Sequence, residues 1–140
     1  MKIKIIPYND EWPLLFETIK KEIKKIIIDN EIIIEHIGST SVYNLASKPI
    51  IDILIGVGSN ELDMYIKPIK NLGYTYIKDY EIETPNRRFF FYEKNKKRIA
   101  HIHLVKKNSR WFKRHLAFRN ELRSNKVIRK KYQSLKYSLS

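Results

Sequence analysis

A Gly-Ser-Thr-Ser run and a solitary acid stand fourteen residues apart in the first half of the chain. Gly38 begins the run, with Ser39 and Thr40 after it, and Asp52 lies among isoleucines and a leucine. Glycine lets the backbone turn tightly, and amide N–H groups and small hydroxyls are donors for phosphate oxygens. A carboxylate in apolar surroundings must be paired, hydrogen-bonded or bound to a metal. These residues predict a phosphate site with Asp52 as its catalytic residue, whereas the Gly-Ser pair taken alone is more typical of an ordinary turn.

Two histidines alternate with apolar residues later in the chain. His101 and His103 are two apart, so in a strand both imidazoles point to one face of the sheet. Such rings can ligate a metal or donate to phosphate, and Glu35 can add a carboxylate if its strand neighbours that of Asp52. The expected cofactor is a divalent metal, Mg²⁺ or Mn²⁺ with Zn²⁺ as an alternative, held by these four residues. The competing interpretation is a pair of half-exposed sheet histidines and a surface carboxylate.

Three basic residues are candidates to balance the charge of a bound phosphate. Lys48 precedes the strand of Asp52, Arg88 begins a strand with three phenylalanines, and Arg119 borders an apolar helical stripe. A guanidinium beside an apolar stripe, like that of Arg119, usually has a fixed anionic partner. The alternatives are solvation for Lys48 and, for Arg88, a position in water at the sheet margin.

Basic charge is concentrated in the C-terminal part of the chain. Residues 87–140 hold 18 Lys/Arg and 2 Asp/Glu, whereas residues 1–86 hold 10 and 13, so the net charge of +13 divides into +16 and −3. Such an asymmetry favours a polyanionic partner, which includes nucleic acid bound through the basic C-terminal half. A solvated helical face of a lysine-rich protein is the competing explanation.

Composition restricts the class of protein. With 140 residues and no cysteine, the chain predicts a single domain over 1–140 without disulfides or Cys-ligated metals. The longest apolar stretch, 49–57, contains Asp52 and is far shorter than the roughly 20 residues that a membrane span needs. We therefore expect a cytoplasmic protein that has no membrane partner.

Hydrophobic periodicity predicts an α+β fold, in which a mixed sheet is covered by helices and the chain ends in a helical pair. The predicted strands cover 32–37, 49–57, 74–77, 88–92 and 99–105, and the last two form a hairpin around Asn95. Helices are expected over 10–29 after the N-cap Asp10, over about 60–72 with a kink at Pro68, after a cap at Asn108 or Ser109, and over 127–139. In the third helix, one predicted stripe contains Trp111, His115, Phe118 and Leu122. Residues 78–86 are expected to form an exposed acidic loop.

The layout around Asp52 also resembles the nucleotidyltransferase superfamily. Its members end one strand in Gly-Ser and place two alternate acids for Mg²⁺ on the next strand. Asp52 matches the second acid, but Ile50 stands at the first-acid position. The resemblance therefore implies a related fold and leaves two-metal chemistry without one of its usual ligands.

Longer segments, in order over nearly the whole chain, resemble the GrpB family. They are IIPYNDEWPLLFE (6–17), IEHIGSTSVYNLASKPIIDILI (34–55), LGY (72–74), RRFFFY (87–92), HIHLV (101–105), Trp111, HLAFRNELR (115–123) and YQSLK (132–136). The resemblance implies the nucleotidyltransferase-like fold, with Ser39 and Asp52 at its site, and the missing first acid is a trait of the family. Tyr43-Asn44 replaces the usual Pro-Gly, and Asn tolerates the left-handed backbone that such a loop needs.

Three functions are consistent with these observations. The leading hypothesis is a protein that binds a nucleotide or another phosphorylated small molecule, with metal-dependent nucleotidyl transfer as its possible reaction. The second is a non-catalytic basic module for RNA or an acidic protein. The third is an accessory domain in coenzyme or nucleotide metabolism, which the resemblance implies because relatives occur fused to dephospho-coenzyme A kinase.

Overall fold

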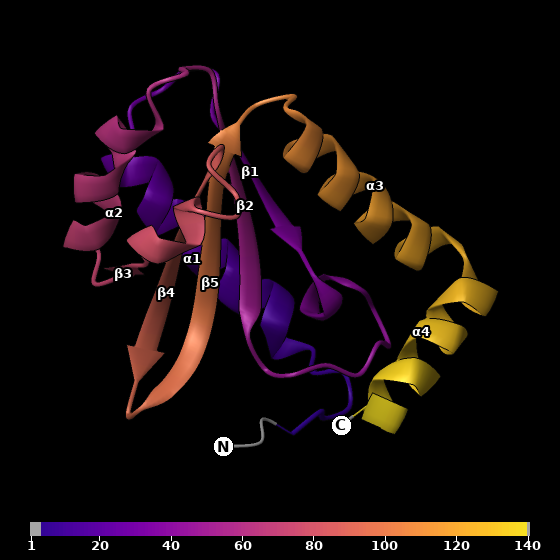
Figure 1. Cartoon of the computed structure of the whole chain (residues 1–140). Coiled ribbons are helices and arrows are strands. Elements are labelled where there is room, and N and C mark those ends of the chain that lie inside the picture. The colour runs from indigo at the N-terminus through magenta and orange to yellow at the C-terminus, as the bar shows by residue number, and fades with distance from the viewer. Residues whose placement is uncertain (1–3, 140) are drawn as a thin grey trace.

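A five-stranded mixed sheet in the order β1-β2-β5-β4-β3 organises the computed structural model, which describes residues 4–139 (Figure 1). The strands are β1 (Ile33–Ile37), β2 (Ile51–Val57), β3 (Thr75–Tyr76), β4 (Arg87–Lys94) and β5 (Lys97–Lys106). Strands β2 and β5 pair in parallel, whereas the other three pairs are antiparallel. The sheet therefore joins an N-terminal hairpin-like pair to a C-terminal meander along one parallel seam.

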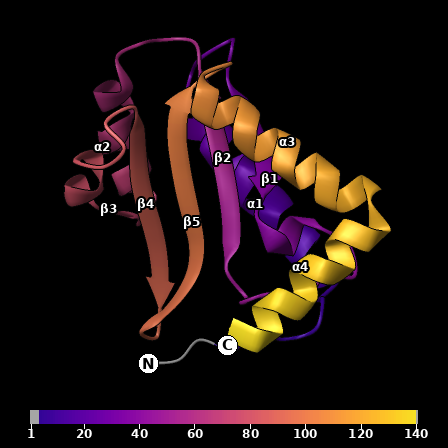
Figure 2. The same cartoon turned by 45° about the vertical axis from the view of Figure 1, so that its right-hand side comes forward.

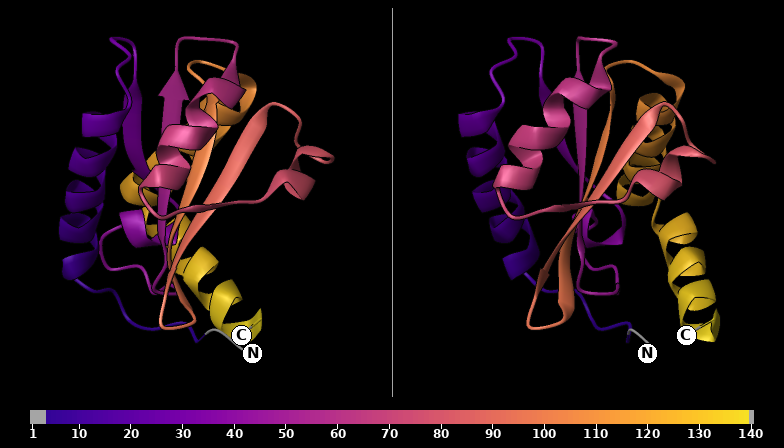
Figure 3. Two further views of the ribbon diagram at one scale, coloured as in Figure 1. Left: turned by 90° about the vertical axis from the view of Figure 1, so that its left-hand side faces the viewer. Right: turned by 60° about the vertical axis from the view of Figure 1, so that its left-hand side comes forward.

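Helices cover both faces of this sheet (Figures 2 and 3). They are α1 (Glu11–Ile26), α2 (Ile66–Asn71), α3 (Arg110–Ser124) and α4 (Lys126–Leu139), and the short 3₁₀ turns are η1 (Ser39–Ser41), η2 (Leu62–Tyr65) and η3 (Lys78–Glu81). Helices α1 and α2 lie on one face, and α3 and α4 lie on the other, as the right panel of Figure 3 shows. The predicted α+β class with a C-terminal helical pair is confirmed.

The two faces differ in how much apolar surface they bury. The α1/α2 face holds the main core, where Ile51, Ile53 and Ile55 of β2 pack with Phe16 and Ile23 of α1. Under α3, a smaller apolar cluster contains the buried residues Ile37, Leu54, Val105 and Phe112. Because strand residues alternate between faces, Asp52, His101 and His103 lie on this second, less apolar face. These three polar side chains of the sheet are thus on the α3/α4 side.

A single glycine sets how closely α3 approaches the sheet. A Cβ on Gly56 would lie 2.6 Å from Cε2 of Phe112, which is closer than real Cβ contacts allow. The ring of Phe112 therefore packs directly on the β2 backbone, and α3 is buried along Phe112, Arg119 and Leu122. The predicted stripe through Phe118 was wrong at that residue, because its side chain is half exposed and contacts Tyr132 of α4.

Most predicted elements are confirmed, with local corrections. The hairpin turns at Asn95 and Lys96, which have positive φ angles of 54° and 63°. Asp10 occupies the N-cap position of α1 without a capping bond, and Asn9 instead accepts a hydrogen bond from the N–H of Glu11 at 2.8 Å. The predicted kink at Pro68 was wrong, because the segment divides into η2 and α2 and the proline lies in the first turn of α2.

The predicted acidic loop at 78–86 contains the turn η3. Within the described part of the chain, no helix combines the length and the apolar character that crossing a bilayer requires.

The main core yields a stability prediction for Ile53→Ala. Ile53 is fully buried, so the free energy of unfolding should fall by about 2–5 kcal/mol, measured by urea denaturation. Ile28→Ala is the matched control, because Ile28 is 96% exposed and the same change there should cost less than about 0.5 kcal/mol. Equal losses in the two variants would contradict this assignment of the core.

Candidate functional site

The parallel seam between β2 and β5 brings Asp52 to both predicted histidines. Asp52 pairs with His101 across the seam, and Leu54 pairs with His103. As a result, Oδ1 of Asp52 lies 3.1 Å from Nε2 of His103 and 3.5 Å from Nδ1 of His101. The structure therefore brings together three of the four residues predicted as metal ligands.

The tautomer of His103 follows from its two partners. Its Nδ1 lies 3.0 Å from Nη1 of Arg87, and a guanidinium can only donate, so Nδ1 accepts. The ring proton is therefore on Nε2, from which it is donated to Asp52. Arg87 itself lies near the rings of Phe89 and Trp111, at 5.4 and 5.6 Å from their centroids. Both ring nitrogens of His103 are thus engaged, Nδ1 by Arg87 and Nε2 by Asp52.

Burial and hydrogen bonding act in opposite directions on the pKa values of these groups. Burial raises the pKa of Asp52, but hydrogen bonds from His101 and His103 outweigh it and hold that pKa well below its ordinary value. Burial lowers the pKa of His103, although Asp52 acts in the other direction. At neutral pH, Asp52 is therefore ionised and His103 is a neutral donor.

The Gly-Ser-Thr loop is shaped around Asp52. Gly38 has a φ of +75°, and a Cβ there would lie 2.6 Å from Oδ2 of Asp52. The glycine is needed both for its left-handed backbone and for this close approach. Ser39 lines the hollow beside Asp52, and its hydroxyl has no hydrogen-bond partner within residues 4–139. Ser39 and Asp52 therefore face one space, as the sequence predicted.

Thr40 does not reach this space. Its side chain is buried, and its Oγ1 lies 2.9 Å from Nε2 of His36 and 3.4 Å from the carbonyl of Ile50. The hydroxyl donates to that carbonyl, so the imidazole donates to the hydroxyl. The structure therefore does not bring Thr40 to the predicted phosphate position, because protein groups occupy its hydrogen-bonding positions.

Helices α3 and α4 fix the loop through long basic and amide side chains. Arg119 donates to the carbonyl of His36 at 3.0 Å, and Arg123 donates twice to the carbonyl of Ser41, at 3.0 and 2.9 Å. From α4, Gln133 accepts from the N–H of Ala46, and Lys136 donates to the carbonyl of the same residue at 3.1 Å. The C-terminal helices therefore position the loop rather than contact it loosely.

Two other predicted residues face away from Asp52 or are already paired. Arg119 is buried and also donates to Asn120 and contacts Glu35 at 3.6 Å, so neither Arg119 nor Glu35 is free for a ligand. Leu54 separates Glu35 from His103 in the sheet. The structure therefore brings neither Arg119 nor Glu35 to its predicted place beside Asp52, because the two side chains pair with each other.

Arg88 lies on the opposite face of the sheet from Asp52. Its partner across β5 is Leu104, a residue of the main core, and its Nε contacts Asp63 at 2.8 Å and Glu81 at 3.2 Å. The structure therefore does not bring Arg88 to the predicted phosphate position beside Asp52, because alternation along β4 turns its side chain away from the histidines.

The residues do not form a ready metal site. Within residues 4–139, no three His, Asp or Glu side chains are arranged to hold a metal ion. Ile50 stands at the first-acid position, Glu35 pairs with Arg119, and His103 uses both ring nitrogens within the protein. The arrangement therefore does not fit a divalent metal held by Asp52, His101, His103 and Glu35.

A hollow of about 400 Å³ opens beside Asp52 and His101. Its lining residues come from the loop, β2, β5 and α4, and they are Ser39, Ser47, Lys48, Ile50, Asp52, Arg98, His101 and Lys136. Three of these side chains are cationic and one is a carboxylate. The hollow therefore has an excess of positive charge.

Sequence reasoning missed Arg98 and Lys136. Strict alternation groups Arg98 with Ala100, away from His101, but a register shift between Tyr92 and Glu93 breaks the alternation. The guanidinium of Arg98 consequently lies 4.2 Å from the ring of Phe91, on the side of His101.

No feature of the sequence around Lys136 indicates that it reaches the hollow, because only the packing of α4 brings it to Ala46. Burial lowers the pKa of Lys136 to about 8, with a further contribution from Lys48 and an opposing one from Asp52.

Comparisons with known proteins place this geometry in context. A family model described as "GrpB protein" matches residues 2–140. The crystal structure of conserved protein GrpB from Enterococcus faecalis superposes with a TM-score of 0.86 at 38% identity, covering 97% of this chain and 82% of that one.

Curated relatives are similar over nearly the whole chain. They include UPF0157 protein YqkA of Bacillus subtilis, 38% identical, and Glutamate-rich protein GrpB of Alkalihalophilus pseudofirmus, 29% identical, each matched over 99% of this chain. The matched part is 40% of YqkA and 82% of the Alkalihalophilus protein. These names state no activity, so function must be argued from the site.

The opposed effects on Asp52 yield a titration prediction. In the wild type, the ¹³Cγ resonance of Asp52 should remain that of a carboxylate well below pH 3.9, the ordinary pKa of aspartate, because the histidines stabilise the charge. In the double variant His101→Ala/His103→Ala, burial acts alone, so the pKa should rise above that ordinary value. NMR titration measures both. A wild-type midpoint near pH 4, or the same midpoint in the double variant, would contradict the assignment.

Proposed function

The chain belongs to the GrpB family, and we propose that its hollow beside Asp52 binds a phosphate-bearing small molecule such as a nucleotide. The observation that carries the proposal is the convergence of Lys48, Arg98 and Lys136 on one space. These cations come from three separate segments of the chain, so their meeting is a product of the tertiary fold. The free hydroxyl of Ser39 adds a neutral donor for a phosphate oxygen.

The charges of the hollow match an anion better than a neutral ligand. Asp52 is the carboxylate in the lining, and its Oδ1 is already engaged by the two histidines. The ammonium group of Lys48 has no ion pair within residues 4–139, and Arg98 contacts an aromatic ring rather than an acid. Two cations are therefore available without breaking an existing ion pair, which keeps the cost of binding low.

We propose ligand binding rather than two-metal nucleotidyl transfer. Transfer by that route needs two acids that hold metal ions, whereas Ile50 replaces one and Glu35 is paired with Arg119. Nucleotidyl transfer from a nucleoside triphosphate is the alternative reaction. It predicts tighter binding with Mg²⁺ or Mn²⁺ and product release over time.

Binding of RNA or an acidic protein by the basic C-terminal half is the alternative partner. Several of its arginines are used within the protein: Arg119, Arg123 and Arg129 each donate to backbone carbonyls. These three arginines therefore fix the loop and the junction of α3 and α4, whether or not an external anion is bound. An RNA complex would weaken steeply with salt and would survive mutation of Asp52.

Binding can be tested by titration calorimetry with ATP, with and without Mg²⁺ or Mn²⁺, at fixed ionic strength. Lys48→Gln and Arg98→Gln should each weaken binding roughly tenfold or more, because each removes a charged contact of about 1.5–3 kcal/mol. Lys97→Gln is the matched control, since Lys97 is exposed, adjacent to Arg98 and outside the hollow, and it should change affinity less than about twofold. Equal effects at residues 97 and 98 would contradict the proposal.

The depressed pKa of Lys136 predicts a pH dependence. Its charge is lost as the pH rises through about 8, whereas the phosphates of ATP are fully ionised above pH 7. Affinity should therefore fall roughly tenfold between pH 7 and pH 9.5, the worth of one charged contact. In Lys136→Met, whose fold is checked by circular dichroism, affinity should be weak at pH 7 and nearly flat to pH 9.5. The same decline in both proteins would exclude Lys136 as its source.

A further inference from the structure

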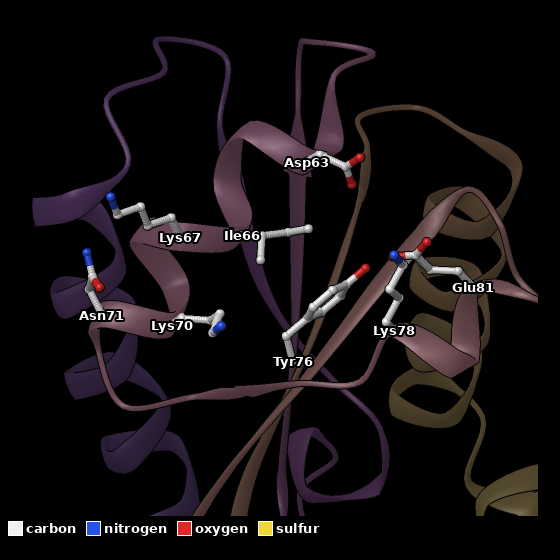
Figure 4. A pocket seen from close by; sticks show the side chains of 8 residues that line it. All are labelled: Asp63, Ile66, Lys67, Lys70, Asn71, Tyr76, Lys78 and Glu81. Carbon is white, nitrogen blue, oxygen red and sulfur yellow. The ribbon is translucent and has the colours of Figure 1, made fainter.

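A second and larger hollow, of about 680 Å³, lies on the α1/α2 side of the sheet (Figure 4). Helix α2 forms one wall and the turn η3 forms the other, with β3 between them. It shares no residue with the hollow beside Asp52, which is on the α3/α4 side. Its volume is within the roughly 300–1,000 Å³ of small-molecule sites. The space is therefore large enough for a ligand of its own.

Three lysines surround this hollow. Lys67 and Lys70 project from α2, and Lys78 projects from η3 on the other side (Figure 4). All three are exposed, and none forms an ion pair within residues 4–139. Their positive charge is therefore available to an anion that enters from solvent.

The acids of the same hollow are neutralised by Arg88. Its Nε contacts Asp63 at 2.8 Å and Glu81 at 3.2 Å, and its Nη1 donates to the carbonyl of Pro85 at 2.7 Å. Asp63 belongs to η2, which directly precedes α2, and Glu81 belongs to η3, so this one guanidinium links the two sides of the hollow. With Arg88 included, the lining has an excess of two positive charges.

The floor of the hollow contains an aromatic ring and an aliphatic side chain. Tyr76 packs one side of its ring on Phe90, with the centroids 5.2 Å apart and the planes inclined by 37°. Its hydroxyl end points into the hollow, and Ile66 lies beside it (Figure 4). Phe90 is fully buried, so the tyrosine ring rests on the core and is held in place. A planar group could stack or pack against this floor while the lysines face its charge.

We propose that this hollow is a second binding site, for a small organic anion that joins a flat ring to a phosphate or carboxylate group. Ammonium groups on flexible stems bind such acids as point charges, and the fixed ring of Tyr76 selects for a planar partner. Arg88 acts as a positioning residue, because it holds the acids away from the ligand and sets the distance between the walls. The site is independent of the proposed function, since it lies on the other face of the sheet.

Residue-resolved NMR titration with adenosine 5′-monophosphate tests this site. Amide signals of residues 66–78 should shift and saturate, whereas inorganic phosphate or adenosine alone should bind these residues at least tenfold more weakly. A carboxylate arm with benzoate distinguishes the two acidic groups: shifts at the same residues would assign the site to both acids, and their absence would restrict it to phosphate. Absence of saturable shifts at 66–78 with both ring-bearing acids would overturn the proposal.

Two triple variants provide the matched comparison. Lys67→Gln/Lys70→Gln/Lys78→Gln should weaken binding at residues 66–78 at least tenfold. Lys21→Gln/Lys24→Gln/Lys25→Gln removes the same charge from the exposed side of α1 and should change it less than twofold. Equal weakening by the two triple variants would show that the effect depends only on net charge, and it would overturn the proposed site. Lys48→Gln should leave these shifts unchanged, so failure here and failure of the site beside Asp52 are separable.

Discussion

The pairing of Asp52 with His101 and His103 across the β2–β5 seam is the constraint on which the candidate site depends. A carboxylate on this strand would be costly without donors, and the parallel register supplies two imidazoles on the same face. The position of Asp52 then limits the loop, because only a glycine at residue 38 leaves room for Oδ2. The loop that carries Ser39 is therefore shaped by the acid that it faces. The Gly-Ser-Thr run therefore has a structural cause in addition to its proposed function.

The C-terminal helices give the basic half of the chain an internal role. Arg119, Arg123, Gln133 and Lys136 all bond to backbone groups between His36 and Ala46, which are more than 80 residues away in the sequence. These bonds satisfy backbone groups that a loop would otherwise expose. Some basic residues of 87–140 thus fix the loop by hydrogen bonds, and some give the hollow its positive electrostatic potential. This division explains why a basic composition does not by itself identify a nucleic-acid partner.

The sequence predicted the elements well and the site in part, for identifiable reasons. Periodicity located the five strands and four helices, because apolar alternation is set by burial, and the alternation of His101 and His103 correctly placed both on one face with Asp52. Arg88 was misplaced because sequence spacing does not show which face of β4 is turned to the histidines. Arg98 was missed because a β-bulge reverses its face, and Lys136 because only tertiary packing brings it near. What failed were contacts set by register shifts and by distant packing.

The central claim is that the hollow beside Asp52 receives the phosphates of a bound ligand. The most direct measurement is a crystal structure of the chain soaked with ATPγS, in which the terminal sulfur is located by anomalous scattering. Because the chain has no cysteine and two methionines, the ligand sulfur can be distinguished from those of the protein. The account predicts the anomalous peak among Lys48, Arg98 and Lys136, close to the hydroxyl of Ser39. A ligand bound with its sulfur elsewhere and this hollow vacant would contradict it.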